Sequence, residues 1–175
     1  MAPGSRKHRL IEIDWPEFGV AACPPPPSVS ELGARLARLR AKMEALKITH
    51  IVVYGDREHF ANMTYLTGFD PRFEEALLIV GPAATPLILV GNECEAYLGF
   101  SSLHAAGQMR HERFQSFSLL GQPRDRSRPM REILAEEGIC REGCRRFGDM
   151  PDCIGPSWQA RIACRVHMTS GGRRD

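Results

Sequence analysis

The chain has 175 residues, a formal net charge of +2 and a hydrophobic share of 43%. This length suits one domain with a hydrophobic core plus tails, and it is too short for two domains of ordinary size. The near-neutral charge gives no global field that would indicate nucleic acid or an acidic membrane surface as a partner. No apolar run is long enough for a signal peptide or a membrane span, so we expect a cytoplasmic protein whose six cysteines are reduced and unpaired.

Residues 1–27 show little periodicity and end in four consecutive prolines at 24–27. Proline cannot donate a backbone hydrogen bond and favours the polyproline II conformation. We therefore expect a flexible arm and spacer. A proline run can also bind SH3-type domains, but a single isolated run favours the spacer interpretation.

The first strong element begins at Ser28, where the S-x-x-E spacing to Glu31 is typical of a capping box. A helix over 29–46 is predicted, with one apolar stripe at spacings of three and four, formed by Leu32, Leu36, Leu39, Met43 and Leu46. A neighbouring basic face carries Arg35, Arg38 and Lys42. A solvated face explains these three better than phosphate binding does.

Short β-like runs and helical segments then alternate. Strands are predicted over 48–54, 76–80, 86–90 and, more weakly, 113–119. Helices are predicted over 58–66, 92–98 and 131–137, with Gly68 and Gly138 just past two helix ends. The runs 76–80 and 86–90 flank a Gly-Pro-containing turn and predict a hairpin. This alternation indicates an α/β fold with helices packed on a sheet.

After Gly138 the apolar period is lost, although a layered α/β domain would place a strand there. We expect residues 140–175 to be an irregular tail. A coding-frame shift or truncation is the favoured explanation, and a natural flexible tail is the alternative. Zinc binding is a third interpretation, but the spacing lacks paired C-x2-C knuckles; its candidate ligands are Cys140, Cys144, Cys153, Cys164 and His167.

The segment from Asn62 to Phe69, N-M-T-Y-L-T-G-F, resembles the N-x-x-Y-L-T-G-F signature of the N-terminal domain in the creatinase, prolidase and Xaa-Pro aminopeptidase family. The resemblance covers residues 28–139. It implies an α/β domain with a mixed β-sheet flanked by helices and ribonuclease H-like layering. In the family this domain precedes a pita-bread catalytic domain that binds two divalent metal ions through two Asp, one His and two Glu.

No such ligand set follows Gly138, so we expect no cofactor and no catalysis in this chain. The resemblance implies a role in homo-oligomer assembly, or in contact with a catalytic domain, and in shaping the entrance for a peptide or small-molecule substrate. Its candidate entrance residues are Tyr65, Phe69 and Arg72. One alternative is descent from an active Xaa-Pro aminopeptidase. Another is a small adaptor that binds a partner through its basic helix or Cys-rich tail.

Three polar groups invite other chemistry. Asp56, Glu58 and His59 could exchange protons, but Asp56 is better explained as a helix cap. Glu74 and Glu75 are adjacent, so at most one is expected to face any given pocket. Three further residues, Ser101, Ser102 and His104, lack the sequence context of a nucleophilic triad.

Overall fold

The computed structural model describes residues 10–20, 24–139, 144–145 and 162–164, the last two ranges by backbone only. Six strands form one sheet in the order β4-β3-β2-β1-β6-β5. The strands are β1 (His50–Gly55), β2 (Ala76–Val80), β3 (Leu87–Val90), β4 (Arg110–Arg113), β5 (Cys144–Arg145) and β6 (Ile162–Cys164). Strands β3 and β4 pair in parallel and every other pair is antiparallel, so the sheet is mixed, as predicted.

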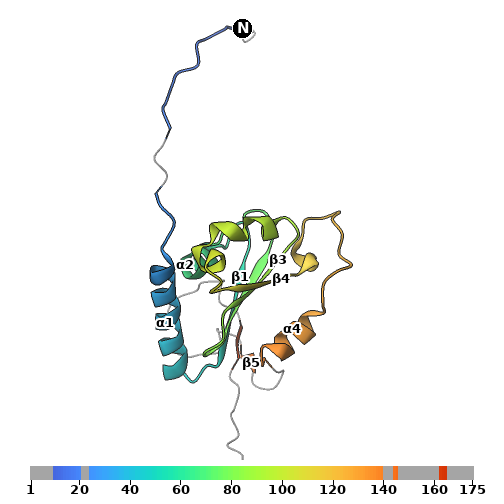
Figure 1. The fold of residues 1–175 in the computed structure, drawn as a ribbon. Helices are drawn as coiled ribbons and strands as arrows, with labels where there is room; N and C mark the ends of the chain where they lie inside the picture. Colours follow the sequence, from blue (N-terminus) through green and yellow to red (C-terminus); the bar gives the residue numbers. More distant parts are fainter. Residues whose placement is uncertain (1–9, 21–23, 140–143, 146–161, 165–175) are drawn as a thin grey trace, which may run out of the picture.

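Helices cover both faces of this sheet. The α-helices are α1 (Val29–Ala45), α2 (Ala61–Thr67), α3 (Ser102–Ala105) and α4 (Met130–Glu136), and the 3-10 helices are η1 (Cys94–Phe100) and η2 (Gln115–Phe117). Helices α1 and α2 lie on one side of the sheet and α4 on the other (Figure 1). The predicted layering of helix, sheet and helix is therefore confirmed.

Strands β2 and β3 are apolar at every position because both of their faces are covered. Along β2, Leu78 and Val80 enter the core beneath α1 and α2, whereas Leu77 and Ile79 pack with Ile133 of α4. Side chains alternate between the two faces of a strand, so consecutive apolar residues supply both cores. The continuous runs at 76–80 and 87–90 are the sequence signature of this arrangement.

Local signals set the ends of the first two helices. The Ser28 hydroxyl accepts a hydrogen bond from the Glu31 amide at 3.2 Å and caps α1. The Glu31 carboxylate pairs with Arg35, one turn onward, instead of completing the capping box. Gly68 ends α2 at φ 70°, a conformation that favours glycine.

Three predicted elements need correction. Asp56 does not cap α2, because its carboxylate accepts from the amides of Glu58 and His59 in the preceding turn, and α2 begins only at Ala61. The predicted helix over 92–98 is a 3-10 helix at 94–100. The strand predicted over 113–119 lies earlier, at Arg110–Arg113, because a polar edge strand carries no apolar period.

The sequence showed no convincing strand after Gly138, yet the structure places two short ones there. Strand β6 pairs with β1, with Cys164 opposite His50, and β5 pairs with β6. The frame-shift and zinc hypotheses rest on residues outside the described ranges or on side chains that are not described.

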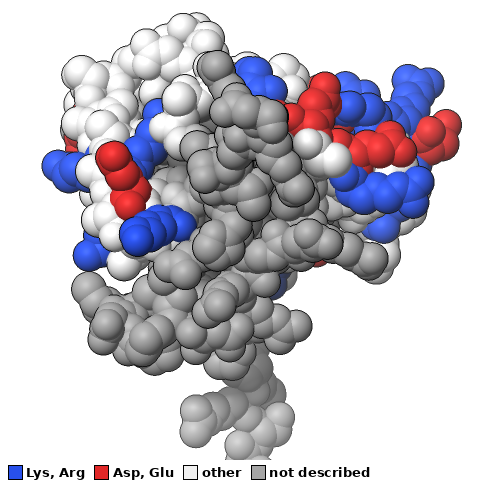
Figure 2. Space-filling model, turned by 90° about the horizontal axis from the view of Figure 1, so that it is seen from below, with Lys and Arg blue, Asp and Glu red and all other residues white. Residues whose placement is uncertain are grey.

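Charged side chains of both signs lie close together on one face of the domain (Figure 2). Lys, Arg, Asp and Glu side chains lie intermingled on the face seen in Figure 2. No helix within the described ranges is both long and apolar enough to cross a membrane.

Candidate functional site

An open hollow of about 530 Å³ lies where β1 ends and β2 begins. These two strands are antiparallel, with Gly55 opposite Ala76, so the end of one and the start of the other meet at the same edge of the sheet. The segment from η2 toward α4 closes the far side. The lining residues are Tyr54, Asp56, Arg57, Glu58, Phe73, Glu74, Glu75, Ser116, Phe117, Ser118, Leu119, Leu120 and Arg124. We call this the acidic hollow.

Four carboxyl groups and two guanidinium groups line the acidic hollow. Both guanidinium groups have partners: Arg57 lies 3.7 Å from the Glu58 carboxylate, and Arg124 donates to the Ser118 carbonyl at 2.9 Å. The excess of carboxyl groups therefore makes the hollow suited to a positively charged group.

Tyr54 lines the acidic hollow, and the neighbouring carboxylates change the pKa of its phenol. Burial raises the pKa of its phenol, and the carboxylates of Glu75 and Asp56, which also hydrogen-bond with it, raise the pKa further. The phenol therefore stays protonated near neutral pH, with its single O–H available to one of these carboxylates at a time. Although burial acts to raise the pKa of Asp56, hydrogen bonds from His59 and from the amides of Glu58 and His59 lower it overall.

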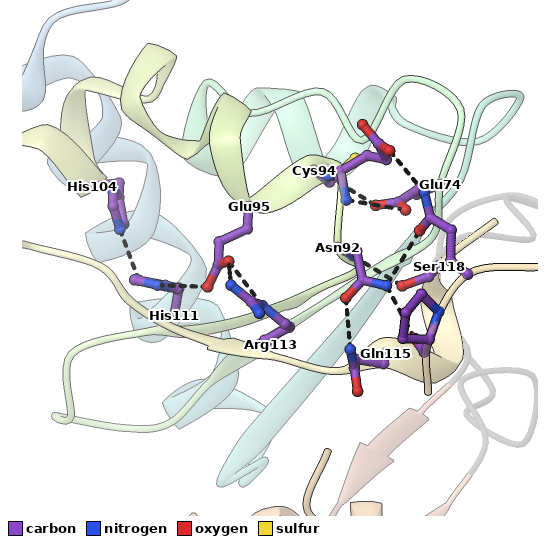
Figure 3. Close-up of polar contacts among 12 residues, drawn as sticks. Glu74, Asn92, Cys94, Glu95, His104, His111, Arg113, Gln115 and Ser118 are labelled. Carbon is purple, nitrogen blue, oxygen red and sulfur yellow. Dashed lines mark hydrogen bonds and ion pairs between the residues drawn. The ribbon is translucent and has the colours of Figure 1, made fainter. Parts of the chain in front are cut away.

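A polar network fixes the inner wall of the hollow (Figure 3). Glu74 is 3% exposed, and its carboxyl group accepts from the amides of Glu93 at 3.2 Å and Cys94 at 2.8 Å. The Asn92 amide donates to the Ser118 hydroxyl at 2.9 Å. These bonds tie the start of η1 to the segment after η2, so the hollow is built on cross-linked backbone.

The Cys94 thiol lies next to this network and is protonated near neutral pH. Cys94 is buried and free, and its sulfur donates to the Pro71 carbonyl. Burial, followed by the nearby Glu74 charge, raises the pKa of the thiol to about 12. The raised pKa keeps Cys94 in its protonated form near neutral pH, which disfavours a nucleophilic role because the thiolate is the reactive form.

A second hollow of about 400 Å³ lies between α1, α2 and β1. Its floor is apolar, from Leu39, Ile51, Val53 and Leu66, and its remaining lining residues are Arg35, Arg38, Asn62 and Tyr65. The Arg35 guanidinium lies 4.5 Å from the centre of the Tyr65 ring and donates to the Tyr65 carbonyl at 2.8 Å. We call this the α1–α2 groove.

The sequence model of the creatinase/prolidase N-terminal domain matches residues 35–98. The matched segment runs from the middle of α1 through η1 and contains the core of the sheet and both walls of the α1–α2 groove. Residues 35–98 are therefore similar to a creatinase/prolidase N-terminal domain. The resemblance drawn from the N-x-x-Y-L-T-G-F segment is thereby confirmed. A comparison with curated proteins gives no match.

This creatinase-type domain does not bring the three entrance candidates together. Tyr65 is 50% exposed and lines the α1–α2 groove. Phe69 is 1% exposed within the core, so its side chain has no access to a substrate in this structure. Arg72 is exposed, with φ at 60°, in the turn after Asp70. Substrate contact by Tyr65 and Arg72 stays a prediction.

The other polar groups are explained by local structure, with one correction. Both Glu74 and Glu75 line the acidic hollow, because they precede β2 and do not yet follow the strand alternation. The hydroxyls of Ser101 and Ser102 donate to the carbonyls of Thr67 and Pro27, Ser101 also caps α3 by accepting from the His104 amide, and the His104 ring pairs with His111. No group of three His, Cys, Asp or Glu within the described residues is arranged to hold a metal ion.

Sequence reasoning missed two features of the domain. The contribution of Tyr54 to the acidic hollow could have been found from its place at the end of a buried strand. A second cluster joins Glu95 of η1 to the side chains of His104, His111 and Arg113 (Figure 3). No sequence signal indicated it, because its members come from η1, α3 and β4.

Proposed function

We propose that this chain acts as the non-catalytic N-terminal domain of a Xaa-Pro aminopeptidase-like or creatinase-like metallohydrolase. Its role is to assemble subunits and to shape the entrance through which substrate reaches a catalytic domain. The match to the creatinase/prolidase N-terminal domain supports this role. The acidic hollow is the observation that indicates which kind of substrate group the domain would bind.

The acidic hollow suits the amino end of a peptide. The carboxylate of Glu75, with the Tyr54 phenol bound to it, offers acceptors to a protonated α-amino group. Phe73 is 41% exposed and Leu120 is 94% exposed at the same hollow. These two side chains offer apolar contact to a first side chain or to a proline ring.

The geometry also favours orientation over bond cleavage. The inner wall is cross-linked by the Glu74 and Asn92 hydrogen bonds, and the adjacent Cys94 thiol is protonated at neutral pH. A rigid wall that binds a charged end can position a substrate for chemistry performed elsewhere. Tyr65 and Arg72 remain candidates for the outer part of the entrance.

The proposal is tested by titrating the purified full chain with a short Xaa-Pro peptide, observed by heteronuclear NMR. The same peptide with an acetylated amino terminus is the matched ligand. We expect shifts around Tyr54 and Glu75 with the free amine, and binding about two- to fivefold weaker after acetylation or in Glu75→Gln, the range for a solvent-accessible ion pair. Glu44→Gln, on exposed α1, is the control variant. Equal binding of both peptides would contradict the proposed role of the hollow.

A second assay tests the non-catalytic part. Purified chain incubated with Mn²⁺, Co²⁺ or Zn²⁺ and a Xaa-Pro peptide is expected to release no more free amino acid than buffer does. Metal-dependent cleavage that co-elutes with the chain over two different columns would favour the alternative, an active aminopeptidase.

A further inference from the structure

Two histidine rings face each other across the gap between α3 and β4 (Figure 3). The distance from His104 Nε2 to His111 Nδ1 is 2.9 Å, and the two ring planes are inclined at 66°. Each nitrogen of a neutral imidazole carries either a proton or a lone pair, so the two rings share one hydrogen bond here. With lone pairs on both nitrogens, the same arrangement can bind one cation between them.

The backbone holds both histidines in place. Leu103, next to His104, is 1% exposed, and Met109, two residues before His111, is 3% exposed. The Gln108 amide donates to the Leu103 carbonyl at 2.8 Å and closes the turn between α3 and β4. Strand β4 then pairs in parallel with β3. Because both rings are carried by elements that are packed on the core, a bound ion has little backbone left to order.

Glu95 of η1 contacts the other nitrogen of the His111 ring. Its Oε1 lies 3.5 Å from His111 Nε2, while its Oε2 accepts from Arg113 Nε at 2.8 Å, which fixes the carboxylate. A carboxylate beside one ring nitrogen favours the proton on that nitrogen and leaves the lone pair on the other, here Nδ1. Histidines that bind metal ions in proteins commonly direct their second N–H at a carboxylate in this way.

The spacing of the two nitrogens suits a tetrahedral metal ion after a small movement. Zn–N bonds are about 2.0–2.1 Å long, so two nitrogens on one tetrahedral Zn²⁺ lie about 3.3 Å apart. The pair opens to this distance by a few tenths of an Å, and the His111 side chain, at 38% exposed, has room to adjust. No third His, Cys, Asp or Glu among the described residues is placed to complete a ligand set, so water fills the remaining positions.

We propose that His104 Nε2 and His111 Nδ1 bind a divalent transition-metal ion of the Zn²⁺, Ni²⁺ or Cu²⁺ class, with Glu95 orienting the His111 ring. Imidazole is a ligand that suits these ions, whereas Mg²⁺ and Ca²⁺ prefer oxygen. Binding shifts the His104 proton from Nε2 to Nδ1 and releases none, because both rings stay neutral. The ion ties α3 to the edge strand β4. This site replaces the expectation of no cofactor and is independent of peptide binding at the acidic hollow.

The test is a Zn²⁺ titration of the full chain at pH 7.5, observed through the histidine ring nitrogens in long-range ¹H–¹⁵N NMR spectra. Accessible cysteine thiols are first alkylated with iodoacetamide, because thiolates compete for Zn²⁺. We expect the signals of His104 Nε2 and His111 Nδ1 to shift together along one saturation curve. The same titration with Mg²⁺ is expected to shift neither signal.

Variants separate a metal site from a simple ion-pair network. Glu95→Gln is expected to weaken Zn²⁺ binding about tenfold, and His104→Gln, which removes a ligand outright, is expected to weaken it more. Glu112→Gln is the matched control for the carboxylate, because Glu112 lies on the opposite face of β4 and pairs with Arg128. His59→Gln is the control for the loss of a histidine. Both controls are expected to bind Zn²⁺ as the wild type does.

Three outcomes would overturn the inference. The first is that millimolar Zn²⁺ leaves the ring signals of His104 and His111 in place. The second is that the His111 signal in His104→Gln shifts with the affinity of the wild type, which would show that the two rings do not share an ion. The third is an equal affinity for Zn²⁺ in Glu95→Gln and Glu112→Gln, which would remove Glu95 from the site.

Discussion

Two clusters of polar side chains lie on neighbouring parts of the domain and differ in one physical property, burial. The Glu74 cluster consists of Glu74, Gly91, Glu93 and Cys94, and Glu74 is 3% exposed. The Glu95 cluster consists of Glu95, His104, His111 and Arg113, whose paired side chains are 27% exposed at Glu95 and 43% exposed at Arg113. Both contain a glutamate with hydrogen-bonded partners, yet only the buried one is expected to matter strongly for folding.

The reason is the cost of losing a partner. A buried donor left without an acceptor loses its interaction with water as well, which costs about 1–3 kcal/mol. An exposed partner is solvated again when its pair is removed, so the loss is about 0.2–1 kcal/mol. The predictions below test this difference, from the largest expected effect to the smallest.

The largest effect is expected for Gly91→Ala. A Cβ at this position would lie 2.5 Å from Glu74 Oε2 and 2.7 Å from Glu74 Cδ, so the buried carboxyl group would have to move away from the two amides that it accepts from. Overpacking and the lost bonds together are expected to lower the free energy of unfolding by about 2–4 kcal/mol. Urea unfolding measures this change.

Gly99→Ala is the matched control, because a Cβ there meets no atom within 4 Å. Its free energy of unfolding is expected to stay within about 0.5 kcal/mol of the wild type. A Gly91→Ala protein as stable as Gly99→Ala would show that the Glu74 cluster tolerates displacement. Burial would then not make this cluster more important for folding than the exposed Glu95 cluster.

The second prediction compares the same substitution in the two clusters. Glu74→Gln replaces one acceptor oxygen by an NH₂ group and leaves the amide of Glu93 or Cys94 unsatisfied, so we expect a loss of about 1–3 kcal/mol. Glu95→Gln is expected to cost less than about 1 kcal/mol. If urea titrations gave the same loss in the free energy of unfolding for both variants, burial would not explain the difference expected between the two clusters.

Sequence reasoning succeeded where one element contains its own signal. The runs at 76–80 and 86–90 predicted β2 and β3 because both faces of these strands are buried, and the serine at 28 predicted the start of α1 because a cap needs only adjacent residues. The N-x-x-Y-L-T-G-F segment indicated the family for the same reason. These features depend on neighbours in sequence.

The two hollows and both clusters could not be predicted in this way, because their members come from separate elements. Glu74 meets Cys94 across 20 positions, and Arg113 meets Glu95 across 18. Phe69 shows the opposite error: its place in a family signature suggested a surface role, although its ring fills the core. A motif identifies a domain more reliably than it distinguishes core residues from surface residues.

The third prediction concerns the ion pair of the Glu95 cluster. A double-mutant cycle with Glu95→Gln and Arg113→Gln is expected to give a coupling free energy of about 0.3–1 kcal/mol at low salt. Since both groups contact solvent, the coupling is expected to fall when 0.5 M NaCl is added. The same cycle on Glu112 and Arg128, whose exposures are 24% and 47%, serves as a reference pair. A coupling above about 2 kcal/mol, or one insensitive to salt, would show that the Glu95 pair behaves as a buried one.

The smallest effect is expected from the histidines of the Glu95 cluster. His104 shares a hydrogen bond with His111 at 2.9 Å, and burial, followed by repulsion from His111, lowers the pKa of His104 below its usual 6.5. Between the pKa of His104 in the unfolded chain, near 6.5, and its lower pKa in the folded domain, His104 is protonated in the unfolded chain and largely neutral in the folded one. The contribution of neutral His104 to the free energy of unfolding is therefore fully present above this pH range and is lost as the pH falls through it.

Wild-type protein is therefore expected to melt at a lower temperature at pH 5.5 than at pH 7.5, and His104→Gln is expected to reduce that difference. Burial also lowers the pKa of His50, so the slope should persist in part in the His104 variant. Combining His104→Gln with His50→Gln is expected to flatten it further. If the change in melting temperature between pH 5.5 and pH 7.5 were the same in His104→Gln as in the wild type, solvent would screen the His104–His111 repulsion fully. All four residues of the Glu95 cluster would then behave as exposed groups.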